Sequence, residues 1–474
     1  MHINKNYFSN NNLLNFLISL IPLTLIIGNT ATNINIILIC LLGLKDYKLE
    51  IFKSNNLKYF YVLYSFFIYL ILITLYKNIP NLEINILYKE HIFKSLFFLR
   101  FLILFLVINH FIKIGGFNIK LFFISGAFFS SVLAIDILIQ LKFGVNLFNS
   151  PFQGHRPTSF FGDEDIAGGY LQKFSLFFIF LSAFYFKSKK IKLIHILSSY
   201  LFFLLIIILI GNRMPALIYI SSVFLFYYLF PGKKKVILSL LIITLLIFTY
   251  YFKSNDRVRS YSQGFYVQTK NMILYLPRLF YYGDKIYAEM WANDELNSFG
   301  NGQLVVFNSG IQRWKEYKFL GGGLKSFRLE CRTWRESDHL KDIISKLGTG
   351  PRTGITYHGE IGFGFETCTT HPHNYTIEIL HDTGLVGFIL IYLTLFLIFL
   401  DFFKIYNRKY NLNSKLLSVP FFLIIFFEFF PLRSTGSFFT TNNSVVIFLI
   451  LAIFINISKL NLINSKPEDI IKKN

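Results

Sequence analysis

Apolar segments of membrane-spanning length recur along the whole chain. They lie at about 13–28, 31–44, 59–76, 95–112, 121–141, 168–186, 194–210, 214–230, 236–252, 385–403, 416–432 and 443–457. A helix needs about 20 apolar residues to cross the hydrocarbon core of a bilayer, so this pattern predicts about twelve transmembrane helices. The second and twelfth runs are short for that task. We therefore expect an all-α polytopic membrane protein, in agreement with a composition that is 54% hydrophobic and includes 58 Phe.

The same pattern divides the chain into four parts. Nine runs lie in residues 1–252 and three in 385–458. Between spans nine and ten lies a polar segment, 253–384, and the chain ends in a polar tail, 459–474. The polar segment has about 130 residues, which is the size of a small domain. We expect it to form one large loop segment outside the membrane.

Lysine-rich connections mark one side of the membrane. They are 45–58, 187–192, 233–235 and 404–415, and with twelve spans they all fall on the same side as both termini. The positive-inside rule assigns that side to the cytoplasm, which places 253–384 at the periplasmic face. The net charge of +21 therefore reports topology and does not indicate a nucleic-acid-binding protein. No small-residue cleavage site follows the first run, so we expect an uncleaved first span.

Three arginines are exceptions to this charge pattern. Arg156, Arg213 and Arg433 lie in short outer loops, where the rule predicts few cations. A guanidinium group matches the oxygens of a phosphate, so a bound anion would account for all three. The alternatives are snorkelling or pairing with the acidic triplet 163–165, in which Glu164 is a further candidate as a base or a cap.

The segment His371–Phe388 carries the strongest candidate for chemistry. On a helix, His373 would share one face with Gly384, and Asn374 would share another with His381. We expect this helix to end near Gly384 and to lead directly into a membrane span, with the imidazole at the water–lipid boundary. A histidine that only caps the helix start is the structural alternative.

Weaker signals lie in the same outer region. A metal site built from the histidines at 371, 373 and 381 would be a loose pattern, and we predict no metal. The run Gly321–Gly323 is read as a tight turn, with a phosphate cradle as the alternative. Cys331 and Cys368 share an oxidising compartment in this topology, which favours a disulfide; a pair of free thiols is the alternative.

Five pieces of the chain together resemble a known family. They are RPTSFFGDEDIAGGYL at 156–171, GNRMPAL at 211–217, FLGGGLKSFRLEC at 319–331, CTTHPHNYTIEILHDTGLVG at 368–387 and PLRSTGSFF at 431–439. Their order and their placement on outer loops resemble the O-antigen ligase/polymerase family of bacterial inner-membrane proteins. The resemblance covers most of residues 150–440, whereas the first 140 residues match in hydropathy only.

The resemblance implies a membrane glycosyltransferase that uses no metal or other cofactor and works at the periplasmic face of the inner membrane. Such proteins move a glycan from undecaprenyl pyrophosphate to a sugar hydroxyl of the acceptor. By motif position, Arg156 and Arg213 would bind the pyrophosphate, and His373 would engage the acceptor hydroxyl as a general base or hydrogen-bond partner. The supporting candidates are Asn374, Glu164 and Arg433.

Other functions stay open at this stage. An O-antigen ligase uses lipid A–core as the acceptor, whereas a polymerase uses another carrier-linked glycan; we favour the ligase because so large an outer segment precedes the histidines. A transporter of an anionic or lipid-linked solute is a further alternative. It would place charges deep in several spans and often show an internal repeat, but only Asp136, Arg100 and Glu428 stand out and no repeat is visible. A structural partner without turnover is the last alternative.

Overall fold

The computed structural model describes residues 5–53, 58–82, 86–151, 156–162, 164–229, 234–254, 256–282, 302–328, 370–407 and 412–463. Within these ranges the chain is helical and contains no β-strand, only an isolated bridge between Val145 and Pro151. The all-α prediction is confirmed. The helices that follow one another from the N-terminus are α1 (Lys5–Ser19), α2 (Ile21–Ile27), α3 (Asn29–Tyr47), α4 (Glu50–Lys53), α5 (Lys58–Asn78), α6 (Ile86–Lys113), α7 (Ile119–Phe143), α8 (Ala167–Phe180), α9 (Ser182–Tyr185), α10 (Lys189–Ile210), α11 (Arg213–Leu229), α12 (Lys234–Ser254), α13 (Asp256–Tyr282), α15 (Gly302–Glu316), α18 (Tyr375–Asn407), α19 (Leu412–Glu428) and α20 (Thr441–Ile463). Two short 3₁₀ turns, η1 (Ile79–Asn81) and η2 (Ser159–Phe161), complete the set.

Seven of the described helices are long and apolar enough to cross a membrane. They are Tyr59–Asn78, Tyr88–Lys113, Ile119–Phe143, Ala167–Tyr185, Lys189–Ile210, Lys234–Ser254 and Tyr375–Phe403. An eighth span is added if the bent pair α1–α2 is counted as one. Each predicted apolar run coincides with a helix, but α3, α11, α19 and α20 are not among the seven. The structure thus supports a polytopic membrane protein, while the predicted number of twelve spans is not confirmed among the described helices.

The first predicted span is broken. Asn10–Ser19 and Ile21–Ile27 meet at an angle of 46° instead of forming one straight helix. Pro22 lies in the first turn of α2, where its missing N–H group costs no helical hydrogen bond. At the other end Gly28 has φ +125°, a conformation that residues with a Cβ rarely adopt, and α3 begins directly after it.

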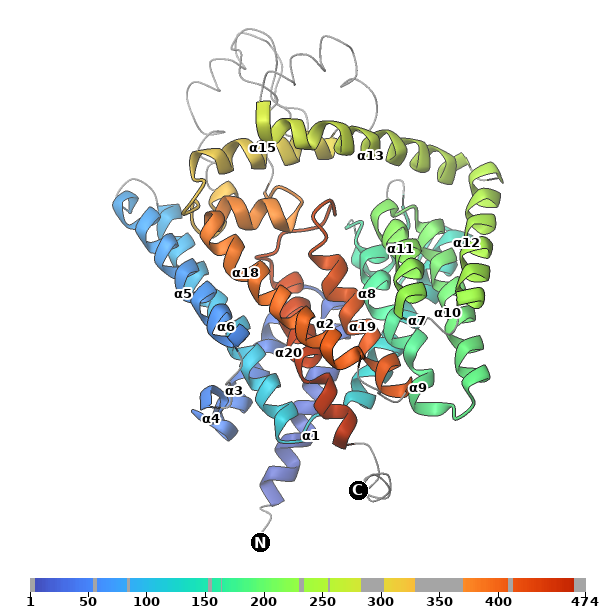
Figure 1. Ribbon diagram of the computed structural model, residues 1–474, viewed down its shortest axis with the longest axis horizontal. Helices are drawn as coiled ribbons and strands as arrows, with labels where there is room; N and C mark the ends of the chain where they lie inside the picture. The colour runs from blue at the N-terminus through green and yellow to red at the C-terminus, as the bar shows by residue number, and fades with distance from the viewer. Residues whose placement is uncertain are drawn as a thin grey trace.

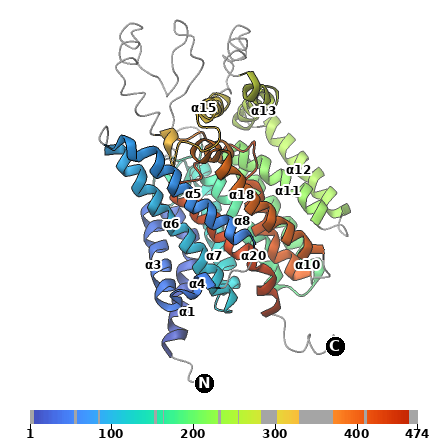
Figure 2. The ribbon, with the colours of Figure 1, turned by 60° about the vertical axis from the view of Figure 1, so that its left-hand side comes forward.

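The helices form a bundle with two distinct ends (Figure 1). α1 begins and α20 ends at one end, while α13 and α15 lie across the opposite end (Figures 1 and 2). These two helices belong to the predicted outer segment 253–384, and the loop 317–328 continues from α15. α13 and α15 therefore lie at the end opposite the one where the first described helix begins and the last one ends.

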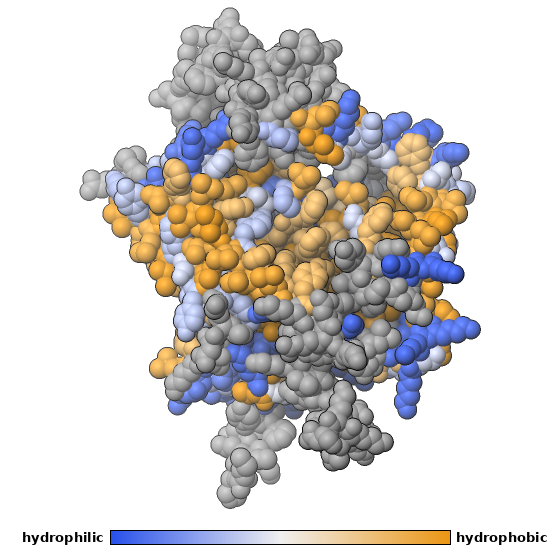
Figure 3. Space-filling view, in the orientation of Figure 1, coloured by the Kyte–Doolittle hydropathy of each residue, from blue (hydrophilic) through white to orange (hydrophobic). Residues whose placement is uncertain are grey.

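Apolar side chains cover the middle of the molecule. Figure 3 shows hydrophobic residues over much of one face, with hydrophilic residues more frequent toward its ends. Phe97 on α6 and Leu246 on α12 are examples of large apolar side chains that are exposed. An exposed apolar surface of this extent is expected of a protein whose surroundings are lipid.

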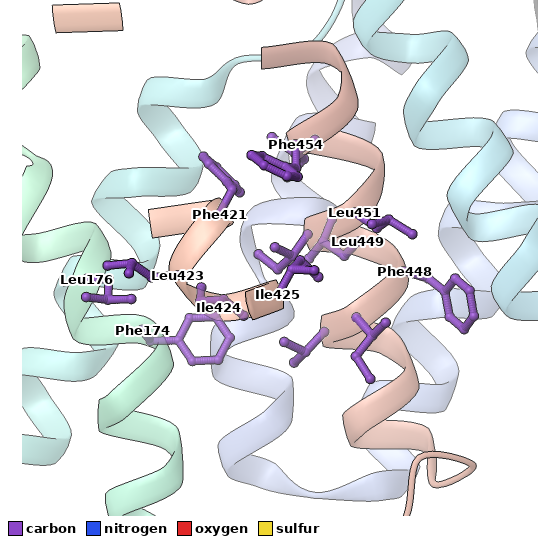
Figure 4. Close-up of a cluster of buried hydrophobic side chains, with 14 of the residues drawn as sticks. Phe174, Leu176, Phe421, Leu423, Ile424, Ile425, Phe448, Leu449, Leu451 and Phe454 are labelled. Atoms are coloured by element: carbon purple, nitrogen blue, oxygen red, sulfur yellow. The ribbon is translucent and has the colours of Figure 1, made fainter. Parts of the chain in front are cut away.

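Aromatic packing holds the bundle together. α8, α19 and α20 meet in a cluster that includes Phe174, Phe421 and Phe448 (Figure 4). Lipid chains are as apolar as these side chains, so close van der Waals contact has to stabilise the helix pairs. Gly126 of α7 provides such contact: a Cβ atom there would lie 2.9 Å from the ring of Phe177 on α8.

Candidate functional site

The histidine segment ends in a capped helix start. The side chain of Asn374 accepts a hydrogen bond from the backbone N–H of Ile377 (3.0 Å), which makes Asn374 the cap of α18. His373 lies one residue earlier, outside the helix, with φ +51°. The expectation that His373 occupies a helical face is therefore wrong. The asparagine that follows it satisfies the helix start better, since its short side chain reaches the free N–H groups of the first turn.

The helix breaks where the sequence predicts. Gly384 has φ +61° and ψ −168° inside α18, so the segment from Tyr375 to Thr383 is a short helix that leads into a longer one. A Cβ atom on Gly384 would lie 2.2 Å from the carbonyl oxygen of Phe319, and one on Gly321 would lie 2.5 Å from that of Asp382. Only glycine at both positions permits this close approach of the two backbone segments.

The triple glycine forms the other half of this contact. The amides of Gly322 and Gly323 donate to the carbonyls of His381 (2.9 Å) and Asp382 (2.8 Å), which precede the break. Beyond it, the amide of Leu385 donates to the carbonyl of Lys318 (2.9 Å). Gly321–Gly323 thus binds the carbonyls that the broken helix leaves without partners.

Side-chain hydrogen bonds in a buried polar cluster also hold the glycine-containing loop against α18. His381 and Asp382 contact each other (2.9 Å), and the hydroxyl of Ser326 donates to Asp382 (3.1 Å). Asp382 also accepts a hydrogen bond from the amide of Lys325 (2.6 Å). His381 is therefore part of a structural cluster. Among the described residues there is no group of three or more His, Cys, Asp or Glu that could hold a metal ion.

The start of α18 is joined to the loop between α19 and α20. The amide of Thr435 donates to the carbonyl of His373 (2.8 Å). The side-chain amide of Asn374 donates to the carbonyls of Pro431 (2.6 Å) and Arg433 (3.0 Å). These bonds hold the turn that carries His373 against the loop that carries Arg433, although the two segments lie far apart in the sequence.

Glu378 secures the far end of that loop. Its carboxylate accepts hydrogen bonds from the hydroxyl of Ser437 (2.5 Å) and the amide of Phe438 (2.6 Å), and all three groups are buried. Asn374 and Glu378 lie one helical turn apart on α18, so together they hold both ends of the loop 431–438.

Arg433 occupies a buried ionic cluster. Its guanidinium group lies 2.7 Å from Glu428 and donates to Gln172 of α8 (3.2 Å). Lys173 approaches the same carboxylate at 3.2 Å. Two cations thus share one carboxylate, and burial of this excess positive charge favours an anion nearby.

The rings of the two histidines lie close together, with their planes tilted by 45°. The rings of His371 and His373 are 4.1 Å apart between centroids. Burial lowers the pKa of both, and the neighbouring His373 and the cations Lys325 and Arg328 contribute further to lowering the pKa of His371 to about 3. Both imidazoles are therefore neutral near pH 7, the state in which an imidazole can accept a proton.

Arg156 and Arg213 lie in two adjoining loops. Arg156 pairs with Asp165 (3.3 Å), as the pairing alternative anticipated, and the side-chain amide of Asn212 donates to the carbonyl of Asp165 (3.2 Å). Arg213 follows Asn212 as the first residue of α11. Glu164 is exposed and its side chain makes no ion pair or hydrogen bond with the described residues, while Asp163 lies outside them.

α7 anchors the loop of Arg156. The amide of Ser159 donates to Gln140 (2.8 Å), its hydroxyl donates to Asp136, and its carbonyl accepts from Asn146 (2.9 Å). Asp136, one of the charges noted within an apolar run, is thus a structural anchor. Ser159 has φ +55°, and these three contacts hold it there.

α13 and α15 cover both groups of candidate residues. A Cβ atom on Gly264 of α13 would lie 3.3 Å from the guanidinium nitrogens of Arg213. On α15, a Cβ atom on Gly310 would lie 2.9 Å from Pro372 and 2.5 Å from Ile377. Since the two helices lie side by side across one end of the bundle, Arg213 and the histidine segment lie under the same cover (Figures 1 and 2).

Part of this site was not predicted from the sequence. Lys173 lies within an apolar run and was not among the predicted site residues. A charged residue in an apolar run is itself a signal for a buried partner. Lys325 and Arg328 lie in a motif that was noted for its glycines. Cys331 and Cys368 lie outside the described residues, so their disulfide stays a prediction.

A comparison with protein families places the site in a known context. The model of the family described as O-antigen ligase matches residues 198–392, a segment that contains Arg213 and His373 and excludes Arg156 and Arg433. No curated protein matches the chain. Residues 198–392 of this chain are therefore similar to the O-antigen ligase family.

Proposed function

We propose that the chain is a membrane glycosyltransferase that transfers a glycan from undecaprenyl pyrophosphate to a sugar hydroxyl of lipid A–core. The observation that carries this proposal is the attachment of His373 to the loop of Arg433, through the amide of Thr435 at 2.8 Å. It joins a neutral imidazole to a buried cluster with excess positive charge. These are the two groups that such a transfer requires, a proton acceptor for the hydroxyl and cations for the departing anion.

The proposed reaction is a direct displacement at the anomeric carbon. The acceptor oxygen forms a bond to that carbon, and the bond between the carbon and the pyrophosphate oxygen breaks with its electron pair on the leaving group. The proton of the hydroxyl passes to the imidazole of His373. Arg156 and Arg213 bind the pyrophosphate, and the charge of Arg433 adds to the stabilisation of the negative charge that develops on it.

The cover formed by α13 and α15 supports the same proposal. Electrostatic contacts are stronger where water is excluded, and Arg213 lies against α13 while Pro372 lies against α15. The donor lipid would stay in the bilayer, with its pyrophosphate beneath these helices. Asn374 and Glu378 act as positioning residues because they hold the loop of Arg433 against α18.

We assign this end of the bundle to the periplasmic face of the inner membrane. The connection between α9 and α10, with Lys187, Lys189 and Lys190, lies at the opposite end, where α1 begins and α20 ends (Figure 1). The positive-inside rule makes that opposite end cytoplasmic, together with both termini.

Reconstitution tests this function. The purified protein in liposomes is supplied with a glycan on undecaprenyl pyrophosphate and, in parallel reactions, with lipid A–core or a second carrier-linked glycan. We expect a product of lower mobility on a gel with lipid A–core. If product forms with the carrier-linked glycan but not with lipid A–core, the protein is a polymerase. If neither acceptor gives a product, the proposal is contradicted.

A further inference from the structure

Two cations beside the histidines have no part in the proposed mechanism. Lys325 and Arg328 lie in the loop 317–328, which continues from α15. Their charges act on His371 and contribute to lowering its pKa, so both lie near its imidazole. Neither side chain makes a hydrogen bond or an ion pair with the residues that the structure describes. The three donors of the ammonium group and the five of the guanidinium group are therefore available to a ligand.

The backbone at Lys325 is held in a conformation that few residues other than glycine adopt. Its φ is +58°, in the left-handed region. The amide of Lys325 donates to Asp382 of α18 (2.6 Å). The amide of Leu324 donates to Thr74 of α5 (2.9 Å), and its carbonyl lies 2.9 Å from Nδ1 of His91 on α6. Contacts with three helices thus fix the strained residue, as is common where a side chain has to meet a ligand.

The carboxylates nearest Lys325 are already engaged by other donors. Glu378 and Asp382 attract the ammonium group electrostatically, but neither forms an ion pair with it. The oxygens of Glu378 accept hydrogen bonds from the loop 431–438, and those of Asp382 accept from Ser326 and from the amide of Lys325. Burial lowers the pKa of Lys325, because a half-buried ammonium group without an acceptor is costly. An anionic ligand would supply the missing acceptor.

These two cations lie on a different side of α18 from the other cationic groups of the site. The loop 317–328 is bonded to α5 and α6, and α5 packs against α18. Arg213 begins α11, and Arg433 donates to a side chain of α8. Figure 1 shows α5 on one side of α18 and both α8 and α11 on the other. His371 and His373 directly precede α18, so cations flank the two imidazoles from both sides.

The geometry of the proposed displacement gives the two sides different roles. The attacking hydroxyl and the leaving group lie on opposite sides of the anomeric carbon in a direct displacement. Arg156 and Arg213 are assigned to the pyrophosphate that leaves. The cations on the other side of the histidines therefore face the substrate that supplies the hydroxyl.

We propose that Lys325 and Arg328 bind an acidic group, a phosphate or a carboxylate, that the acceptor glycan carries near its reacting hydroxyl. This inference rests on the proposed function, which defines the acceptor. It makes the acceptor an acidic glycan and the two cations determinants of acceptor specificity. The displacement itself needs neither of them, since the proton passes to His373.

Binding of the acceptor in the absence of donor tests this inference. The full-length protein, purified in detergent, is titrated calorimetrically with the core oligosaccharide released from lipid A–core. We expect K325Q to weaken the affinity roughly tenfold, because a charge-assisted contact is lost, and K325R to retain most of it. R328Q should lose about threefold, since Arg328 is exposed and its contact is screened. K318Q is the matched control: Lys318 is exposed in the same loop and does not act on His371, so its affinity should equal that of the wild type.

Two altered oligosaccharides identify the acidic group. One has its phosphate groups removed, and the other has its carboxyl groups reduced to alcohols. We expect the wild type to bind at least one of them roughly tenfold more weakly, and K325Q to show no further loss with that form, because the two changes remove the same contact. Equal affinity of the wild type for all three oligosaccharides would overturn the proposal. Wild-type affinity of both K325Q and R328Q for the intact oligosaccharide would also overturn it.

Transfer assays separate this inference from the proposed function. K325Q should raise the KM for the acceptor and leave kcat and the KM for the donor within about twofold. A raised KM for the donor with unchanged acceptor binding would assign the cations to the pyrophosphate and overturn the proposal. If the wild type binds the acidic oligosaccharide through Lys325 but transfers no glycan, the proposed function fails and the binding site stands. If K325Q is not recovered folded, R328Q at its exposed position decides by the same criteria.

Discussion

Thr435 donates its backbone amide to the carbonyl of His373 at 2.8 Å, and this bond unites the two halves of the candidate site. One half is the turn before α18, which carries a neutral imidazole. The other is the loop between α19 and α20, whose Arg433 lies in a buried ionic cluster. The stability of that cluster, the protonation of the histidines and the break at Gly384 each lead to a measurable consequence.

The shared carboxylate is the key member of the cluster. E428Q would leave Lys173 and Arg433 buried without a counter-charge, so we expect a loss of about 3 kcal/mol or more in unfolding free energy. K173M would leave a neutral pair and should cost less than half as much. Thermal unfolding in detergent measures both. The exposed pair is the control, because K94Q should change stability by less than about 0.5 kcal/mol. A larger loss in K173M than in E428Q would contradict this description.

The half-buried histidines predict a dependence on acid. Burial and neighbouring cations lower the pKa of His371 to about 3, while the unfolded chain protonates near 6.5. The unfolded state therefore binds the proton first, and stability falls as pH decreases below about 6.5. H371Q cannot take up this proton, so its unfolding temperature should fall less than that of the wild type between about pH 7.5 and 4.5. Parallel curves for the two proteins would show that the pKa of His371 is not lowered in the folded state.

The break in α18 requires glycine. G384A would place a Cβ atom 2.2 Å from the carbonyl oxygen of Phe319 in a backbone conformation that favours glycine, and we expect a loss of about 3 kcal/mol. Gly169 of α8 is the matched control, since a Cβ atom there meets nothing within 4 Å and alanine should be neutral or stabilise the helix. Unfolding by heat compares the two variants. Equal stability of G384A and wild type would mean that α18 is not broken there.

Local patterns were sufficient to predict the helices and the break. Apolar runs coincide with helices, and the glycine near position 384 ends the short helix before the span, because both features depend on neighbouring residues. The position of His373 was predicted wrongly, since Asn374 directly after it is the better cap. The pairing of Lys173 with Glu428 joins residues of α8 and α19, and only tertiary packing brings these together. The number of spans also depends on packing, which bends α1 against α2.

The most direct test of the central claim is the transfer rate of H373Q under single-turnover conditions with lipid-linked donor and saturating acceptor. Loss of a general base predicts a rate lower by roughly 10²- to 10⁴-fold, with donor binding retained. H195Q is the matched control, because His195 lies in α10 against Phe178 and Phe186, and its rate should stay within about twofold of the wild type. A wild-type transfer rate in H373Q would contradict the account.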